Sequence, residues 1–465
     1  MEFYAVLHPS KLELVMGCFK NQFNFKEPKG VIMRRLLALT VSIIAVPVYA
    51  QSSGSVLTTG QSSDHLSVYA GALNPALGDL IVPSNEQFRM GYLPSISTVA
   101  EVGQVDDFAD ELNNLIDIID DPRKNTEPVQ DVLDRFNSIL EKMGSTGYIK
   151  NTSAIHAPLT PLYWKLPIWD GTLMADVHIT SQALARVLDA PLSYDEQNGS
   201  FTTATSAYLK GAVQTAFALG YSQAWFDSTE VRTYGGQLYA GAKVSIYSVD
   251  LSKQVFLLQR LDGKNISDVV RDEFDNNTHS STAPSLDVGV IWAAQSYRLG
   301  ATLYNLNQPS FDYGAVGENC QTRTENSIER ANCEATADFA QVRGDLKTLE
   351  THKKNAYLSV DGMYYWQPNA WVSAALDLSD YNDFVGTQNQ WLNISSTYSP
   401  ATHWLPTARA GIQKNLAGSK LTQLSLGFEF KGISLDLAWA LEKTRADGSQ
   451  LPRSLGIALA VSEQF

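Results

Sequence analysis

Hydrophobic and polar residues alternate along the last segment of the chain, from Arg453 to Phe465. The large apolar residues share one parity with the terminal residue: Leu455, Ile457, Leu459, Val461 and Phe465. The small residues have the other parity: Gly456, Ala458, Ala460 and Ser462. Because side chains of a strand point alternately to opposite faces, this pattern predicts a strand with an apolar face and a small-residue face. Glu463 departs from the pattern, and an ordinary amphipathic edge strand would also alternate in this way.

Similar alternating segments recur through the second half of the chain and are separated by short turns. They cover residues 285–294, 298–305, 357–366, 371–378, 408–414, 421–430 and 433–441. Lys431-Gly432 predicts a tight two-residue turn between the last two segments. Trp and Tyr gather near segment ends, which suits the two aromatic girdles of a membrane barrel. The pattern favours an all-β fold, a transmembrane antiparallel β-barrel, although a soluble β-sandwich or β-helix would also alternate.

One region, residues 104–145, has helical periodicity instead. Apolar residues recur there at helical spacing in two stretches, with Pro122 placed to end the first helix and Gly144 the second. We therefore expect an inserted α-helical hairpin whose first helix is strongly acidic. The hairpin could plug the lumen, cap one mouth, bind a basic partner, or be a packed accessory element with a solvated acidic face. A shorter helical pattern covers Ser181 to Leu188.

The N-terminal region has the organisation of a secretory signal peptide at residues 33–50. Met33-Arg34-Arg35 is basic, residues 36–48 are apolar, and Ala50 precedes a polar stretch. The apolar run is too short to span a bilayer as a helix, and no longer apolar run follows. Residues 1–32 are then expected to be a non-native or extended N-terminus, with a genuine long presequence as the alternative.

Charge and cysteine usage agree with an exported protein. The chain has a formal net charge of −14, and its first 50 residues are basic, so the remainder is more acidic still. This acidity argues against direct binding of nucleic acid, which needs clustered Lys and Arg. Cys320 and Cys333 lie in a polar stretch, residues 314–342. In an oxidising compartment they are expected to form a disulfide that closes this loop, worth about 3 kcal/mol for a loop of this size.

Three features resemble a known superfamily. Leu73-Asn74-Pro75-Ala76-Leu77 is similar to the Asn-Pro-Ala motif of the FadL-like outer-membrane β-barrels. Residues 286–311 and 424–441 resemble strands of these proteins, and the last strand, which stops on Phe465, resembles the C-terminal signal of bacterial outer-membrane barrels. The order of Asn-Pro-Ala, strand, acidic helical hairpin and barrel strands resembles the branch called conjugal transfer protein TraF, plasmid transfer operon type.

Two features depart from this resemblance or limit it. The cysteine-bearing loop at residues 314–342 has no counterpart in the pattern of the branch. The TraF name is also shared with a periplasmic thioredoxin-like conjugation protein. This chain has no Cys-x-x-Cys, so the redox role of that protein is not implied.

The resemblance implies a particular organisation and location. It implies about 14 strands, an N-terminal plug segment at residues 51–87, and a barrel at residues 88–465 in the outer membrane of a Gram-negative bacterium. Asn74, Pro75 and Ala76 would then be the gate of the plug. The implied partners are the lipid bilayer and the outer-membrane assembly machinery.

The sequence contains no motif of an enzyme or a metal site. The histidines after residue 50 form no His-Glu-x-x-His and no i, i+4 pair, and no Gly-x-Ser-x-Gly is present. We therefore expect no enzyme activity, cofactor or metal, although a Ser/His site could be assembled from distant strands. Asp377, Asp380 and Asp383 could hold Ca²⁺, but such a cluster is more often a solvated loop.

Two functions remain. In the first, the barrel binds or passes small hydrophobic molecules through a plugged lumen. In the second, it is a structural or accessory outer-membrane component of a conjugal plasmid-transfer apparatus, which would contact envelope protein partners through the helical hairpin and the disulfide loop. A transporter should contain a continuous apolar cavity, whereas a scaffold should have a filled lumen and an exposed apolar patch on the hairpin.

Overall fold

The computed structural model describes most of the chain from Ser53 onward. The described residues are 53–107, 111, 114–115, 117–119, 127–167, 170–226, 228–257, 277–402, 404–446 and 449–464. The predicted signal peptide, the terminal Phe465 and most of the first helix of the predicted hairpin lie outside these residues. Within the described ranges, no helix has the length and apolar character needed to cross a membrane.

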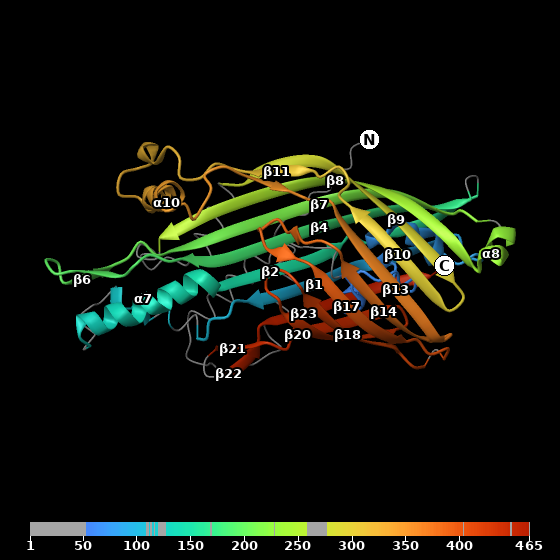
Figure 1. Cartoon of the computed structure of the whole chain (residues 1–465). Helices are drawn as coiled ribbons and strands as arrows, with labels where there is room; N and C mark the ends of the chain where they lie inside the picture. The colour runs from blue at the N-terminus through green and yellow to red at the C-terminus, as the bar shows by residue number, and fades with distance from the viewer. Residues whose placement is uncertain are drawn as a thin grey trace.

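The main sheet closes on itself as an antiparallel cylinder (Figure 1). Its two end strands, β2 (Tyr148–His156) and β3 (Leu162–Leu166), both pair with β1 (Phe88–Val102) on one side and with β4 (Gly171–Leu188) on the other. The two strands therefore follow one another along the same line between β1 and β4 and together count as one strand of the barrel. Residues 157–161 connect them and interrupt that strand. The 15 strands of the sheet thus form a closed 14-stranded barrel, and this confirms the predicted fold class.

The other barrel strands follow the alternation of the sequence. They are β7 (Ser206–Ala224), β8 (Gly236–Leu257), β9 (His279–Ala294), β10 (Tyr297–Tyr304), β13 (Tyr357–Gln367), β14 (Ala370–Asp377), β17 (Trp391–Tyr398), β18 (Thr407–Asn415), β19 (Thr422–Phe430), β20 (Ile433–Ala440) and β23 (Ser454–Gln464). The helix predicted at Ser181 to Leu188 is wrong, because this stretch is the end of β4. Its backbone pairs with β2 on one side and β7 on the other, and this pairing outweighs the local spacing of apolar residues.

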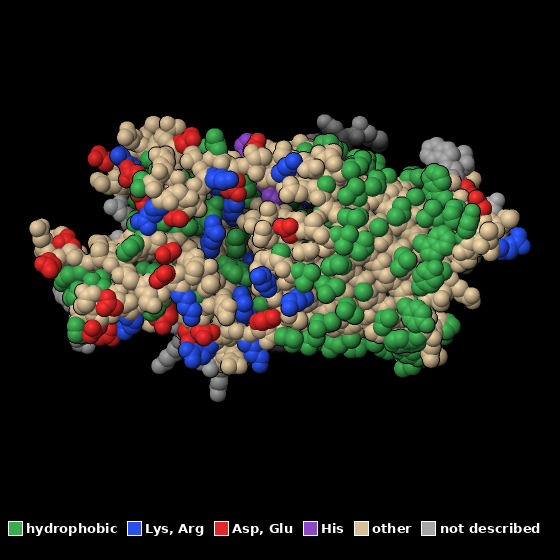
Figure 2. All heavy atoms as spheres, viewed as in Figure 1, with side chains coloured by type: hydrophobic (Ala, Val, Ile, Leu, Met, Phe, Trp, Pro, Cys, Tyr) green, Lys and Arg blue, Asp and Glu red, His purple; other side chains and the backbone are tan. Residues whose placement is uncertain are grey.

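Large apolar side chains cover the outside of the barrel as a belt (Figure 2). On β23, Leu455, Ile457 and Leu459 are exposed, while Ala458 and Ala460 are buried. Strand β20 repeats the arrangement, with Leu435 among its outward residues. Apolar surface of this extent on a closed sheet is stable against lipid and not against water. The belt therefore indicates that the barrel spans a lipid bilayer.

One end of the barrel has the shorter connections. The turns at residues 295–296 and 368–369 and at Lys431-Gly432 lie there, with positive φ at both residues of the last. The exposed Trp and Tyr of the described residues all gather at this end: Tyr92, Trp164, Trp225, Tyr234, Tyr297, Tyr364, Trp366, Tyr398 and Trp404. The exposed Trp and Tyr of the described residues thus form one girdle, and a second girdle stays a prediction.

The opposite end carries most of the additional elements (Figure 1). They are α7 (Val129–Thr146), β5 (Ser193–Asp195), β6 (Ser200–Thr202), β11 (Ser310–Tyr313), η5 (Cys320–Thr322), α10 (Ile328–Ala337), η6 (Asp338–Val342), β12 (Glu350–Lys353), β15 (Tyr381–Asn382), β16 (Gln388–Asn389), β21 (Lys443–Ala446) and β22 (Ser449–Pro452). Helix α8 (Ser228–Tyr234) lies at the short-turn end. The expected disulfide joins Cys320 and Cys333, whose Cα atoms are 5.5 Å apart.

Helix α7 corresponds to the second helix of the predicted hairpin. Its apolar face is buried against the β5–β6 hairpin, where Phe136 packs in one cluster with Leu192 and Phe201. Its outward face is polar and charged, with Arg135 paired to Glu127. Since most of the first helix lies outside the described residues, the hairpin as a unit stays a prediction.

Residues 53–82 lie inside the barrel. They form α3 (Val56–Thr59), α4 (Ala70–Leu73), η2 (Pro75–Leu77) and α5 (Gly78–Ile81), and most of their side chains are buried. Helix α3 contacts β17 to β20 and β23, whereas η2 contacts β7 to β9 and α5 contacts β3, β4 and β7. A segment that touches strands on opposite sides of a closed sheet occupies its lumen.

Candidate functional site in the barrel lumen

Asn74, Pro75 and Ala76 form a buried turn of the interior segment. Asn74 ends α4 and begins η2, where its side-chain Oδ1 accepts a hydrogen bond from the Ala76 backbone N–H at 3.0 Å. Its amide Nδ2 donates to Ser63 Oγ at 3.4 Å. Pro75 follows at the first position of the helical turn, where its missing N–H costs nothing. The sequence motif therefore encodes a capped turn that is held to another part of the same segment.

The turn docks in a recess that two glycines create in the barrel wall. Gly241 on β8 and Gly289 on β9 are direct register partners. A Cβ atom at Gly289 would lie 2.1 Å from Asn74 Oδ1, and one at Gly241 would lie 2.5 Å from the Pro75 carbonyl oxygen. These distances are too short for any side chain, so the close approach of the turn to the wall requires both glycines.

Hydrogen bonds fix the interior segment to strands around the barrel. Lys243 Nζ on β8 donates to the Ala72 carbonyl at 2.6 Å. On the opposite side Thr58 donates to Asp436 on β20, also at 2.6 Å. Asp361 on β13 accepts from both the backbone N–H and the hydroxyl of Ser63, and the Tyr163 hydroxyl on β3 donates to the Val68 carbonyl. These bonds satisfy buried polar groups from several directions and hold the segment in one position.

Two cavities lie between this segment and the far end of the barrel. The larger, about 150 Å³, has Val56 and Leu57 of the interior segment in its wall. The second, about 120 Å³, has Ala72 and Leu73 in its wall. Both are lined by the same four residues on their shared side: Thr152, Gln182, Tyr381 and Asp383. The interior segment therefore forms part of the wall of both cavities.

The lining of the smaller cavity combines aromatic rings with charged groups. Lys243 is neutralised by Asp287 at 3.1 Å. Lys354 has no ion-pair partner among the described residues, and its Nζ lies over the rings of Tyr247, at 4.2 Å from the centroid, and Phe384, at 5.2 Å. Burial lowers the pKa of Lys354 to about 8. An ammonium held over rings, without a carboxylate, can bind an anionic or carbonyl oxygen of a ligand.

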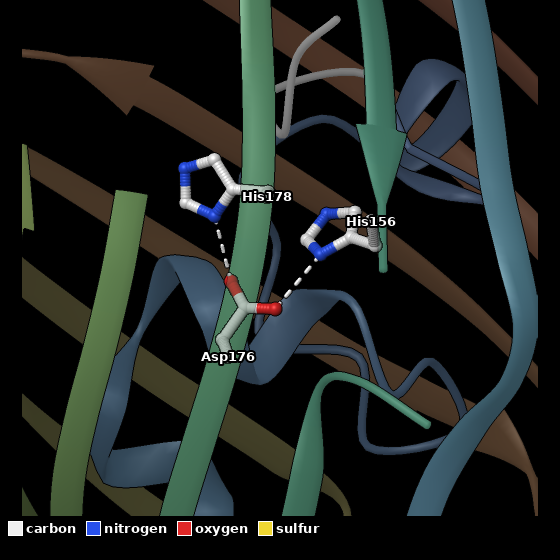
Figure 3. A group of neighbouring side chains, drawn as sticks. All are labelled: His156, Asp176 and His178. Carbon is white, nitrogen blue, oxygen red and sulfur yellow. Dashed lines mark hydrogen bonds and ion pairs between the residues drawn. The ribbon is translucent and has the colours of Figure 1, made fainter. Parts of the chain in front are cut away.

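Two histidines and an aspartate meet beside this cavity (Figure 3). His156 at the end of β2 lies directly opposite His178 on β4, and Asp176 is two residues before His178 on the same face. The Asp176 carboxylate bridges the two rings, with one oxygen 2.9 Å from His156 Nδ1 and the other 2.8 Å from His178 Nδ1. All three side chains are buried, and His178 also lines the smaller cavity.

The three acids considered for Ca²⁺ do not share one site. Asp383 pairs with Lys150 at 2.6 Å, Asp377 accepts from the backbone N–H of Trp391, and Asp380 contacts Gln388. Within the part of the chain that the structure describes, the group of side chains with metal-ligand spacing is His156, Asp176 and His178. Sequence motifs did not identify this group. The spacing of Asp176 and His178 places both on one face of a strand, but only the register between β2 and β4 places His156 opposite His178.

Comparison with known proteins gives a family and distant similarities to solved structures. No curated protein matches the chain in sequence. Among solved structures it is similar to the toluene transporter TodX of P. putida, with 11% identity, a TM-score of 0.47, and coverage of 89% of this chain and 98% of that chain. For a Pseudomonas aeruginosa FadL homologue the values are 12%, 0.32, 90% and 98%. At these values the likeness carries no conclusion about ligands or partners.

The sequence itself also matches a family over one continuous part of the chain. The family described as "F plasmid transfer operon, TraF, protein" matches residues 71–378, which run from within α4 to the residue after β14. This range is more than half of the chain, and it includes the turn at Asn74, the recess that receives it and the histidine pair. The TraF branch that the order of motifs resembles is thus confirmed, and the chain belongs to this family of F plasmid transfer operon TraF proteins.

Proposed function

We propose that this protein is an outer-membrane barrel of a Gram-negative bacterium that binds or passes small molecules through a lumen closed by a plug. Residues 53–82 would be the plug, and the turn at Asn74, Pro75 and Ala76 would be its gate. The observation that carries the proposal is that Ala72 and Leu73, just before this turn, form part of a cavity wall. Movement of the turn would therefore open the cavity toward the short-turn end.

The lining of the cavities supports a ligand with a hydrophobic body and a hydrogen-bond acceptor. Rings such as Tyr247 and Phe384 favour an apolar body, while Lys354 favours a carboxylate or carbonyl oxygen. A pure hydrocarbon in the same place would leave buried polar groups without partners, which is costly. This refines the class expected from the sequence, small hydrophobic molecules, toward amphipathic members of that class.

Calorimetric titration of detergent-purified protein with benzoate, and with toluene as the uncharged comparison, tests this proposal. Benzoate should bind and toluene should bind more weakly. Thr152→Phe should abolish binding, because Thr152 lines both cavities and the larger side chain would fill the space they share. Ile394→Phe on the lipid-facing surface is the matched control and should leave binding unchanged. Equal effects of the two substitutions would refute a lumenal site.

The family match favours a second candidate, an accessory part of a plasmid-transfer apparatus. The contact surface would be the end of the barrel that bears α7 and the loop closed by Cys320 and Cys333. The apolar face of α7 is already packed, so a partner would meet its charged face. Conjugation frequency should fall when Asp131 and Asp134 are both changed to Lys, while the amount of heat-modifiable barrel stays unchanged. Unaltered conjugation in this variant would contradict a role of α7 in assembly.

A further inference from the structure

We propose that His156, Asp176 and His178 bind one divalent transition-metal ion, of the Zn²⁺, Co²⁺ or Ni²⁺ class, at the inner wall of the barrel. Each residue offers one ligand atom, and these atoms all lie within 4.8 Å of one another. Two imidazoles and one carboxylate are a donor set typical of such ions.

The strands place these ligands before any ion binds. His156 and His178 are direct partners in the β2–β4 ladder, and the carboxylate of Asp176 lies between their rings (Figure 3). In a tetrahedral zinc site the ligand atoms are about 3.4 Å apart, given bond lengths near 2.1 Å. The two Nδ1 atoms contact different oxygens of Asp176, at 2.9 and 2.8 Å, and the three ligand atoms lie within 4.8 Å of one another. Binding would therefore require side-chain rotations that bring both rings toward one ion.

An unsatisfied nitrogen distinguishes this group from an ordinary buried histidine pair. Nε2 of His156 is fully buried and has no hydrogen-bond partner. A histidine that serves only to stabilise a core usually satisfies both ring nitrogens. The ion would take Nδ1 of each ring and an oxygen from Asp176, and Nε2 of His156, on the other side of its ring, would not be a ligand.

Access and charge also permit a cation. His178 lines the 120 Å³ cavity, which gives an ion a path to the site from the lumen. The nearby Lys243 is paired with Asp287, so it opposes a cation less than a free ammonium would. The three ligands carry one formal negative charge, that of Asp176, when both imidazoles are neutral.

The site lies where the barrel wall is interrupted. Residues 157–161 leave the ladder directly after His156, and β3 resumes the pairing with β4 at Leu162. An ion held by His156 on one strand and by two residues of β4 would link the two strands at this break. Metal binding would thus stabilise the wall at the place where residues 157–161 leave the ladder.

Titration of metal-free, detergent-purified protein with Co²⁺ alone tests the proposal. The visible absorption of bound Co²⁺ and native mass spectrometry should show one ion per chain. His178→Gln and Asp176→Asn should each weaken binding at least about tenfold, as loss of a ligand or of its orienting partner does. His352→Gln is the matched control, because His352 lines the same cavity but lies outside the group. It should change affinity by less than about twofold, well below the roughly 10- to 100-fold effect of losing a ligand or its orienting partner.

Three outcomes would overturn the proposal: no stoichiometric ion in the wild-type protein, equal weakening in His352→Gln, or X-ray absorption of the bound ion without imidazole ligands. Heat-modifiable electrophoresis shows whether each variant folds. If His178→Gln fails to fold, X-ray absorption of the wild-type protein still decides. Benzoate takes no part in this experiment, so its result is independent of the proposed transport function.

Discussion

At the scale of single residues, the glycine pair facing Asn74 and Pro75 gives the sharpest prediction about the plug. Gly289→Ala would place a methyl group 2.1 Å from Asn74 Oδ1, so the docked turn must shift. Overpacking of this kind costs about 1–3 kcal/mol, which would increase the undocked population about 5- to 150-fold. Ion conductance of the purified barrel in planar bilayers should rise accordingly.

The control for this substitution is Gly362→Ala on β13. A Cβ atom there would meet its nearest neighbours at 3.4 and 3.7 Å, which is ordinary contact. Conductance of this variant should equal that of the wild type. A rise in conductance in both variants would mean that the effect comes from the loss of glycine and not from displacement of the turn.

Lys354 predicts a pH dependence of ligand binding. Its ammonium is the charged form, and burial lowers its pKa to about 8. Affinity for benzoate, an anion throughout this range, should therefore be high below pH 8 and fall as the pH rises through this value. A hydrogen bond to a charged group contributes about 1.5–3 kcal/mol, so the loss should be about tenfold or more. Titrations across this range should show no such fall in Lys354→Met.

The sequence identified some site residues and could not identify others. Asn74, Pro75 and Ala76 stand in a continuous motif, so a resemblance sufficed to single them out. Gly241 and Gly289 are 48 positions apart, and Lys354 lies in an irregular connection. The role of the two glycines depends on which residues the ladder places opposite one another, and a one-residue change of register would turn each of them to the other face.

At the scale of elements, α7 shows how a segment can be predicted while its neighbours are not. Its helical spacing was readable, but its partners Leu192 and Phe201 belong to a hairpin that spacing alone did not indicate. The stretch from Ser181 to Leu188 shows the reverse case. It has helical spacing but forms a strand, because β7 pairs with it along its whole length and β2 pairs with it as far as Arg186.

Phe136→Ala tests whether α7 is independent of the barrel. Phe136 is fully buried against the β5–β6 hairpin, and its truncation should cost about 3–5 kcal/mol of local stability. Hydrogen exchange at residues 129–146 should accelerate, while the heat-modifiable mobility of the barrel should not change. If the barrel also lost its resistance to detergent, α7 would be part of its core.

At the scale of the whole molecule, the outer belt predicts how stability depends on depth in the membrane. Leu459 lies in the middle of β23 and is exposed on the belt. Leu459→Arg should cost about 2–4 kcal/mol, the penalty for a cation near the bilayer midplane. Urea-induced unfolding in lipid vesicles measures this cost. Leu451→Arg on β22, beyond the belt, should cost less than about 1 kcal/mol.

The sequence by itself determined that the chain forms a sheet with an apolar and a small-residue face, and that Cys320 can close a loop with Cys333. These properties depend on local alternation and on composition, which a linear pattern records. The tertiary structure decided which strands are neighbours, where residues 53–82 lie, and that His156 meets Asp176 and His178. Such contacts arise only when a particular register closes the cylinder, because the same alternation is compatible with several registers.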